Sequence, residues 1–401
     1  MYIERTIESK IKSINKTFPA IIITGPRQVG KTSVLKHCME SDRQYITFDD
    51  LIIRKQFKED PALFLQKYTG RLLIDEVQYV PEILSYLKMD IDNNKEYGKF
   101  WITGSQQFHL MKNVSESLAG RIMVLNMQGL SQSEKLGIND KLQFLPQKNY
   151  NIQHSMELNE LYNIIWRGSF PELYNNKNIN PSDFYSSYLK TYIERDVKDL
   201  INIENENSFL KFIQITASRT GQLLNYNDIA NNVGVSVPTI KSWLSVLESS
   251  GLIYLLQPYY NNTTTRLVKT PKMYFLDTGL CSYLSGCYTP EILEKSIMSG
   301  AIFETYVVSE ILKSYWHNGI EPRIYFYRDN NQKEVDILIE ENGKIYPIEV
   351  KKTASPSKND IRHFLVLNKL DKKIENGAVV CLYKDWFPLA ENINAVNIGA
   401  L

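Results

Sequence analysis

Short apolar runs alternate with stretches of helical spacing through the first third of the chain. Strands that are buried on both faces form continuous apolar runs, and helices connect and cover them. The alternation therefore predicts a parallel α/β domain. The predicted strands are Ala20–Thr24, Tyr45–Phe48, Leu72–Asp75, Phe100–Thr103 and Arg121–Leu125.

The pattern changes after residue 130. From Ser131 to about Glu204, Leu, Tyr and Ile recur at helical spacing, which predicts a helical lid or connector. Next come three helical segments and an apolar strand pair, with the spacing of a helix-turn-helix and a wing. After the polar stretch NNTTT, strands such as RIYFYR alternate with helices such as FETYVVSEILKSYW. We therefore expect four parts, the last a separate α/β domain: 1–130, 131–205, 206–260 and 261–401.

Composition adds few constraints. The chain has 401 residues, and its 46 basic and 45 acidic side chains leave it near neutral, so any basic surface for nucleic acid must be local. The N-terminus lacks the apolar core of a signal peptide, and no apolar run approaches the length that spans a bilayer. We expect a cytoplasmic protein without a membrane partner.

The four cysteines form no CxxC pair and no metal-ligand cluster with histidine, so we expect reduced, structural thiols.

The octet GPRQVGKT follows the first predicted strand and precedes a helical stretch. It fits the P-loop spacing G-x-x-x-x-G-K-[ST], in which glycines let backbone N–H groups surround phosphates and the helix N-terminus adds positive charge. Lys31 would reach the β and γ phosphates of ATP, and Thr32 would supply a ligand to Mg²⁺. The predicted nucleotide-binding residues of this loop are Gly25, Pro26, Arg27, Gln28, Val29, Gly30, Lys31, Thr32 and Ser33.

A second element, RLLIDEVQ, is an apolar strand that ends in two carboxylates. This is the form of a Walker B site: Asp75 would hold Mg²⁺ through water, and Glu76 would polarise the attacking water. The alternative is a pair of strand-end carboxylates that face solvent. The order of the two motifs along the chain favours the catalytic interpretation.

Two further positions are candidates for sensing or stabilising the γ phosphate. The strand KFWITGSQQF ends near Ser105 and Gln106, where ATPases of the AAA type place a polar sensor residue. Arg121 follows a small-residue turn and would act as an arginine finger on the nucleotide of a neighbouring subunit, which requires a homo-oligomer. A solvated surface arginine is the alternative for Arg121.

At this point the chain resembles a widespread prokaryotic family of AAA-type ATPases that carry a domain of uncertain function behind the ATPase module. The resemblance extends over nearly the whole chain. Besides GPRQVGKT and LLIDEVQ, it rests on ITGSQQF, SLAGRI, GSFPELY, YLKTYIERDV, FLDTGL and GAIFETYVVSEI. The family usually has a second glycine in the proline turn, where this chain has Arg167-Gly168-Ser169-Phe170-Pro171.

Members of that family end in a domain that looks like a PD-(D/E)xK nuclease, which implies a metal site here. Asp336 and Glu349 would bind Mg²⁺, with Lys351 orienting water and Glu304 as an extra carboxylate. Period two places Glu349 and Lys351 on one face of a strand, and pairing through the turn at Asn342 would bring Asp336 close. The alternative is a nuclease-like fold whose charges only pair with each other.

The predicted helix-turn-helix offers little for phosphate contact. Its recognition stretch SVPTIKSWLSVLESS has one basic residue, Lys241. Arg266, Lys269 and Lys272 are the nearest other basic candidates for contacting DNA, whereas a winged-helix segment can also connect protein parts.

Together these features predict an AAA-type ATPase whose hydrolysis drives or gates a C-terminal nuclease-like domain, acting on DNA. The first alternative is an ATP-dependent switch with an inactive nuclease fold that acts on a protein partner. The second is a P-loop phosphotransferase for a small molecule, against which Glu76 and the strand ITGSQ both argue.

Overall fold

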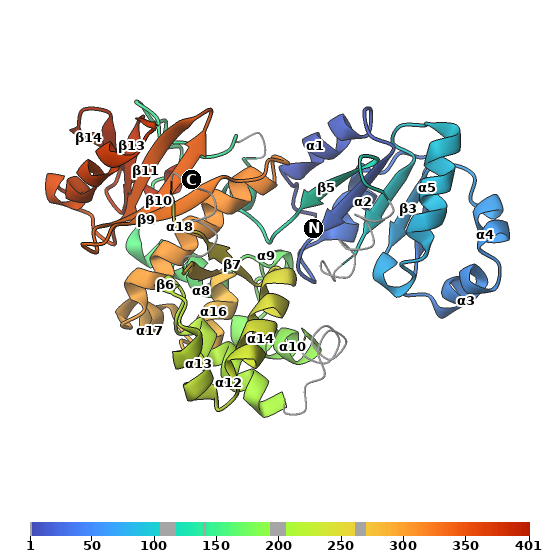
Figure 1. Cartoon of the computed structure of the whole chain (residues 1–401), viewed down its shortest axis with the longest axis horizontal. Coiled ribbons are helices and arrows are strands. Elements are labelled where there is room, and N and C mark those ends of the chain that lie inside the picture. The colour runs from blue at the N-terminus through green and yellow to red at the C-terminus, as the bar shows by residue number, and fades with distance from the viewer. Residues whose placement is uncertain (1, 105–117, 139–141, 193–205, 261–269) are drawn as a thin grey trace.

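The computed structural model describes residues 2–104, 118–138, 142–192, 206–260 and 270–401. Figure 1 shows three regions: an N-terminal α/β region on the right, a C-terminal sheet on the upper left, and helices below the centre. The mixed α/β fold class predicted from the sequence is confirmed.

The N-terminal region is a five-stranded parallel sheet in the order β2-β3-β4-β1-β5. All residues of β1, β3 and β4 are buried, as their apolar runs predicted. The observed strands agree with the predicted ones to within one residue at each end. The elements are α1 (Ile7–Ile14), β1 (Ala20–Thr24), α2 (Lys31–Cys38), β2 (Gln44–Thr47), α3 (Leu51–Glu59), α4 (Pro61–Lys67), β3 (Leu72–Asp75), α5 (Ile83–Asn94), β4 (Phe100–Thr103) and β5 (Ile122–Asn126).

Helices cover both faces of this sheet because successive strand residues point to opposite sides. Ile21 and Ile23 of β1 pack in one buried cluster with the isoleucines of α1 and with Leu35 of α2. Ile22 packs in another with Leu84 of α5 and with aromatic side chains of α3 and α4. Strand β1 is therefore buried on both faces between β4 and β5, and this packing holds the start of the loop that follows it.

The middle of the chain is mainly helical and contains a small antiparallel sheet in the order β6-β8-β7. Helices α13 and α14 are separated by a three-residue turn that begins at Gly234, in the left-handed conformation (φ 89°). Strand β8 lies beyond residue 260 and pairs with β7. The elements are α7 (Gln132–Lys135), α8 (Leu158–Arg167), α9 (Pro171–Asn175), α10 (Pro181–Tyr192), α12 (Glu206–Ala217), β6 (Gln222–Leu223), α13 (Tyr226–Val233), α14 (Val237–Ser249), β7 (Ile253–Leu256), β8 (Lys272–Phe275), α16 (Thr278–Leu284) and α17 (Pro290–Lys295).

The C-terminal region packs one long helix, α18, against a mixed sheet in the order β14-β15-β13-β11-β10-β9, with β12 beside β11. Asn342 and Gly343, both with positive φ, turn β10 into β11 as predicted. The elements are α18 (Ser299–Trp316), β9 (Ile324–Arg328), β10 (Glu334–Glu341), β11 (Lys344–Val350), the 3-10 helix η3 (Lys358–Lys369), β12 (Lys373–Ile374), β13 (Gly377–Cys381), β14 (Trp386–Ala390) and β15 (Ile393–Asn397).

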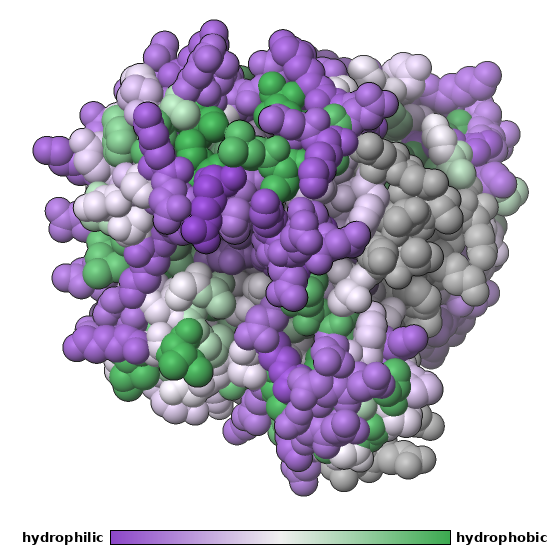
Figure 2. Space-filling model, turned by 60° about the vertical axis from the view of Figure 1, so that its left-hand side comes forward, coloured by the Kyte–Doolittle hydropathy of each residue, from purple (hydrophilic) through white to green (hydrophobic). Residues whose placement is uncertain are grey.

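One continuous hydrophobic cluster joins the helical middle to the C-terminal sheet and reaches Val29 of the P-loop. Figure 2, which brings the C-terminal side forward, shows surface hydrophobic residues in separate groups among hydrophilic ones. Among the described helices, none is long and apolar enough to cross a bilayer.

A buried carboxylate, that of Glu134, lies where the regions meet. One of its oxygens lies 3.1 Å from Arg5 Nε, and the other lies 3.2 Å from Nδ1 of His317, directly after α18. The main-chain N–H of Ser131 donates to it at 2.9 Å. Arg5 also donates to the carbonyl of Val29 at 2.8 Å. Burial opposes ionisation, but Arg5 and His317 outweigh it, so the pKa of Glu134 lies below its usual value.

We predict that Glu134→Gln destabilises the fold, because Arg5 would remain buried without its counter-charge; such losses cost about 3–5 kcal/mol. Denaturant unfolding at pH 7 measures the difference. Since the folded pKa is depressed, the wild-type advantage is present above the unfolded carboxyl value, about 4.3, and declines as pH falls below it.

Glu59→Gln is the matched control, because Glu59 forms an exposed ion pair with Lys55, and such pairs contribute at most about 1 kcal/mol. If Glu134→Gln and wild type are equally stable at pH 7, Glu134 is not the counter-charge that stabilises buried Arg5.

Candidate nucleotide site and carboxylate cluster

The P-loop depends on its two glycines. Gly25 has φ 144°, and a Cβ on it would lie 2.0 Å from the carbonyl oxygen of Met127. Gly30, with φ 95°, ends the loop directly before α2. Both positions need the conformational freedom of glycine, and the first also needs its small size. The loop between β1 and α2 is therefore fixed by the motif itself.

Lys31, Thr32 and Asp75 converge at the carboxyl edge of the sheet. Lys31 Nζ donates to the carbonyls of Gly25 and Pro26 at 2.9 and 2.7 Å. Thr32 Oγ1 donates to Asp75 Oδ1 at 2.8 Å. Carboxyl ends of parallel strands lie at one edge, so β1 and β3 bring the two motifs together although β4 lies between them.

Glu76 follows Asp75 in a left-handed backbone conformation (φ 54°) and lines the same cleft as Lys31. Burial raises its pKa above the usual value, although a hydrogen bond from Gln78 and the charge of Lys31 act in the opposite direction. Glu76 therefore lines the cleft beside Lys31, and its role in polarising water stays a prediction.

Sequence reasoning missed two partners of Asp75. Tyr45, from β2, donates to Asp75 Oδ2 at 3.0 Å, and Thr103, at the end of β4, donates to Oδ1. The signal for Thr103 was its place at a strand end. Ser105 and Gln106, the predicted sensors, lie outside the described residues, so that role stays a prediction.

A cleft of about 730 Å³ lies between the P-loop and helices α9 and α10. The proline turn GSFPELY, which contributed to the family resemblance, supplies Pro171 and Glu172 to its wall. The lining residues are Arg27, Gln28, Gly30, Lys31, Thr32, Ser33, Glu76, Pro171, Glu172, Asn175, Phe184 and Thr191.

Arg121 forms a two-point ion pair with Asp92 of α5, with N–O distances of 2.6 and 3.1 Å. The side chain is partly exposed. Action on a neighbouring subunit would require Arg121 to leave Asp92, and the finger role stays a prediction.

The predicted C-terminal charges lie close together. Asp336, on β10, and Glu349, on β11, are buried, and Lys351 Nζ lies 2.6 Å from Glu349 Oε1. Burial, followed by repulsion from Glu304 and Glu349, raises the pKa of Asp336 well above its usual value. Asp336 Oδ2 accepts a hydrogen bond from the main chain of Val350 at 2.8 Å.

The structure corrects one candidate for DNA contact. Lys272 is buried, and its ammonium lies 3.1 Å from Glu304 and 2.5 Å from Glu334. It therefore cannot reach a phosphate on the surface. Lys241 is exposed, whereas Arg266 and Lys269 lie outside the described residues.

The sequence predicted no metal-ligand cluster of cysteine with histidine, and one candidate group is present in the structure. Glu8, His37 and Cys38 bring three ligand atoms within 4.8 Å of one another, the only such group among the described residues. Glu8 accepts hydrogen bonds from Tyr2 at 2.7 Å and lies 3.1 Å from His37 Nδ1. Burial raises the pKa of Cys38 to about 12, so the thiol is protonated, and these hydrogen bonds account for the group.

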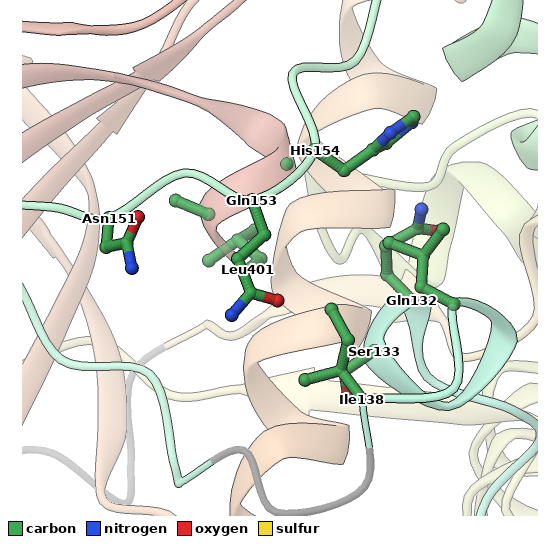
Figure 3. A pocket seen from close by; sticks show the side chains of 10 residues that line it. Gln132, Ser133, Ile138, Asn151, Gln153, His154 and Leu401 are labelled. Carbon is green, nitrogen blue, oxygen red and sulfur yellow. The ribbon is translucent and has the colours of Figure 1, made fainter.

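A separate cavity of about 330 Å³ lies between α7 and the last residues of the chain (Figure 3). Gln132 and Ser133 line one part of it, and His154 and Leu401 lie in another. His154 Nε2 forms a hydrogen bond with Glu160 Oε1 at 2.6 Å. We therefore assign no chemistry to this cavity.

Three family descriptions match consecutive parts of the chain. Residues 17–136 match an AAA domain, residues 158–291 a domain of unknown function (DUF8612), and residues 299–401 another (DUF4143). The N-terminal part is a P-loop AAA domain. The boundaries at 130, 205 and 260 and the nuclease-like and winged-helix assignments stay predictions.

Curated relatives extend over most of the chain. Uncharacterized protein Rv2008c of Mycobacterium tuberculosis and Uncharacterized protein Mb2031c of Mycobacterium bovis are each 27% identical over 382 residues, which cover 94% of this chain and 80% of the relative.

Solved structures are more distant. AMPPCP-bound DnaA from Aquifex aeolicus is 14% identical and matches 60% of this chain and 85% of its own, with a TM-score of 0.30. A RuvB variant from Thermotoga maritima is also 14% identical. The match covers 62% of this chain and 88% of the RuvB chain, with a TM-score of 0.27. These scores are too low to support an argument.

We predict that Glu76→Gln still binds ATP but hydrolyses it about 10²- to 10⁴-fold more slowly, because the amide keeps the shape and loses the charge that polarises water. Phosphate release and nucleotide affinity measure the two effects. Glu82→Gln, an exposed position, is the control; hydrolysis by Glu76→Gln at the wild-type rate would refute the division of roles.

Arg121→Ala should lower hydrolysis much more than nucleotide affinity; fingers contribute roughly 10³ to 10⁵ in rate. Mixing it with Lys31→Ala subunits should restore some activity at mixed interfaces. Asp92→Ala breaks the same ion pair but keeps the arginine, so it should retain hydrolysis. If Asp92→Ala lowers the rate of ATP hydrolysis as much as Arg121→Ala does, the ion pair between Arg121 and Asp92 has a structural role and Arg121 is not a finger.

Proposed function

We propose that the chain binds ATP with Mg²⁺ and hydrolyses it in the cleft between the P-loop and α9–α10. The observation that carries the proposal is the convergence of Lys31, Thr32, Asp75 and Glu76 at one edge of the sheet. A hydroxyl beside a carboxylate is a donor set that suits Mg²⁺, and Thr32 and Asp75 would hold the ion. Mg²⁺ would neutralise charge on the phosphates.

The P-loop residues would divide the remaining work. Lys31 would give up its hydrogen bonds to the carbonyls of Gly25 and Pro26 and bind the β and γ phosphates instead. Glu76 would orient and polarise the attacking water, because it lines the cleft beside Lys31. Arg121 would complete the site of a neighbouring copy in a homo-oligomer.

We further propose that the nucleotide state gates the C-terminal domain. Arg5 binds the P-loop carbonyl of Val29 and pairs with Glu134, which also contacts His317 after α18. A second contact supports the same route, because a Cβ on Gly251, after α14, would lie 3.1 Å from Pro26 of the P-loop. Movement of the loop on binding ATP would therefore reach both the helix-turn-helix and α18.

A second candidate activity is metal-dependent cleavage of DNA by the C-terminal domain. Asp336 and Glu349 would hold the ion with help from Glu304, and Lys351 would orient water. Glu349 Oε2 supports this proposal, since it is buried and has no hydrogen-bond partner among the described residues. Glu304 and Glu349 each form an ion pair with a lysine. These ion pairs support the alternative, in which the nuclease-like fold is inactive and the protein acts as a switch on a protein partner.

One assay separates these proposals. Linear, circular and single-stranded DNA and RNA would be incubated with and without ATP and Mg²⁺, with phosphate release measured in the same samples. We predict that Asp336→Asn abolishes cleavage and leaves hydrolysis unchanged, whereas Glu76→Gln slows hydrolysis by about 10²- to 10⁴-fold.

Glu391→Gln, on the surface of the same domain, controls for a general effect of losing a carboxylate. Cleavage that persists in Asp336→Asn would refute the nuclease site. Hydrolysis without cleavage of any substrate would favour the switch, and phosphate release without an acceptor would dismiss a phosphotransferase.

A further inference from the structure

The ammonium of Lys272 lies inside the C-terminal carboxylate cluster. Only 4% of the residue is exposed. Its Nζ is 3.1 Å from Glu304 Oε1 and 2.5 Å from Glu334 Oε1, and Tyr274 donates to the same Glu304 oxygen at 2.6 Å. Lys272 therefore occupies a position between carboxylates from α18 and β10.

The cluster has one more carboxyl group than cationic side chains. Glu304, Glu334, Asp336 and Glu349 face the cations of Lys272, Lys351 and Arg328. Burial opposes the charge of Lys272, but the surrounding carboxylates outweigh it and raise its pKa. Carboxylates at this density are costly unless a cation neutralises them.

Lys272 reaches the cluster from a different part of the fold. It begins β8, where it pairs with Leu256 of β7. Strand β7 follows directly on the turn at Gly251, which packs against Pro26 of the P-loop. Among the charged groups named above, Lys272 is the one that belongs to the small β6-β8-β7 sheet, as does its neighbour Tyr274. A shift of this sheet would therefore move Lys272 relative to Glu304 and Glu334.

We propose that Lys272 is a built-in counter-cation that blocks the carboxylate cluster, and that a divalent cation of the Mg²⁺ or Mn²⁺ class binds there when the lysine is withdrawn. Oxygen ligands from several carboxylates suit such an ion. The lysine supplies one positive charge in its place, so the cluster is stable in the blocked state. The inference concerns the site of the second candidate activity and rests on that proposed function.

Binding of Mn²⁺ without nucleotide or DNA tests the inference independently of hydrolysis and cleavage. Free Mn²⁺ is measured by electron paramagnetic resonance in titrations of wild type, Lys272→Met and Lys272→Arg. Methionine keeps the length of the side chain and removes its charge, and arginine keeps the charge. We expect Lys272→Met to bind one additional Mn²⁺, or to bind it at least about tenfold more tightly, and Lys272→Arg to behave like wild type.

The double variant Lys272→Met/Asp336→Asn locates the ion, because the gain should disappear when the cluster loses a ligand. A gain that survives Asp336→Asn, or folded Lys272→Met that binds Mn²⁺ no better than wild type, would overturn the proposal.

If Lys272→Met is unstable, its melting temperature with and without Mn²⁺ provides a second test. Mn²⁺ should then raise its melting temperature and leave that of wild type nearly unchanged, since the ion replaces the missing charge. A Lys272→Met protein that does not fold with or without Mn²⁺ would also overturn the proposal, because it would make the ammonium a structural group that no cation replaces.

Discussion

The buried charge of Glu134 constrains how the regions of this protein are joined. A carboxylate in the interior is stable only while cations and main-chain donors surround it. Here these partners come from the N-terminal segment, the turn before α7 and the residue after α18. Because Arg5 also binds the P-loop, the AAA domain and the C-terminal domain cannot separate without exposing or isolating a buried charge. These contacts of Arg5, Glu134 and His317 are the route by which we propose that the P-loop influences the C-terminal domain.

A second buried carboxylate, Asp277, joins the segment before α9 to α10 and α16. It accepts hydrogen bonds from the main chain and hydroxyl of Ser169, each at 2.7 Å, and from Tyr185 at 2.8 Å. Its other contact caps α16 through Leu280. Gly168 has no room for a side chain, since a Cβ would lie 2.0 Å from the Tyr185 hydroxyl. The segments GSFPELY and FLDTGL therefore form one unit, which places Pro171 over the nucleotide cleft.

Much of the fold followed from the sequence because its signals are local. The strands of the AAA domain are apolar runs that are buried on both faces, and the P-loop and the turn at Asn342 are short motifs with one dominant conformation. Sequence could not predict the partners of Glu134 or Asp277, because they come from positions far apart in the chain. The burial of Lys272 was also missed, since a lysine near a polar linker is expected to be exposed until β8 is seen to pair with β7. Asp92 of α5 and Arg121, directly before β5, are 29 positions apart in the sequence and form an ion pair only in the folded chain.

Amide hydrogen exchange on Glu76→Gln, with and without ATP and Mg²⁺, tests the central claim that the nucleotide loop and the C-terminal domain respond together. The account predicts added protection in the P-loop and a simultaneous change at the end of α18 and in β8, and it predicts that the change at α18 is lost when Glu134→Gln is added. A response confined to residues 20–104, with α18 and β8 unaffected by ATP, would contradict it.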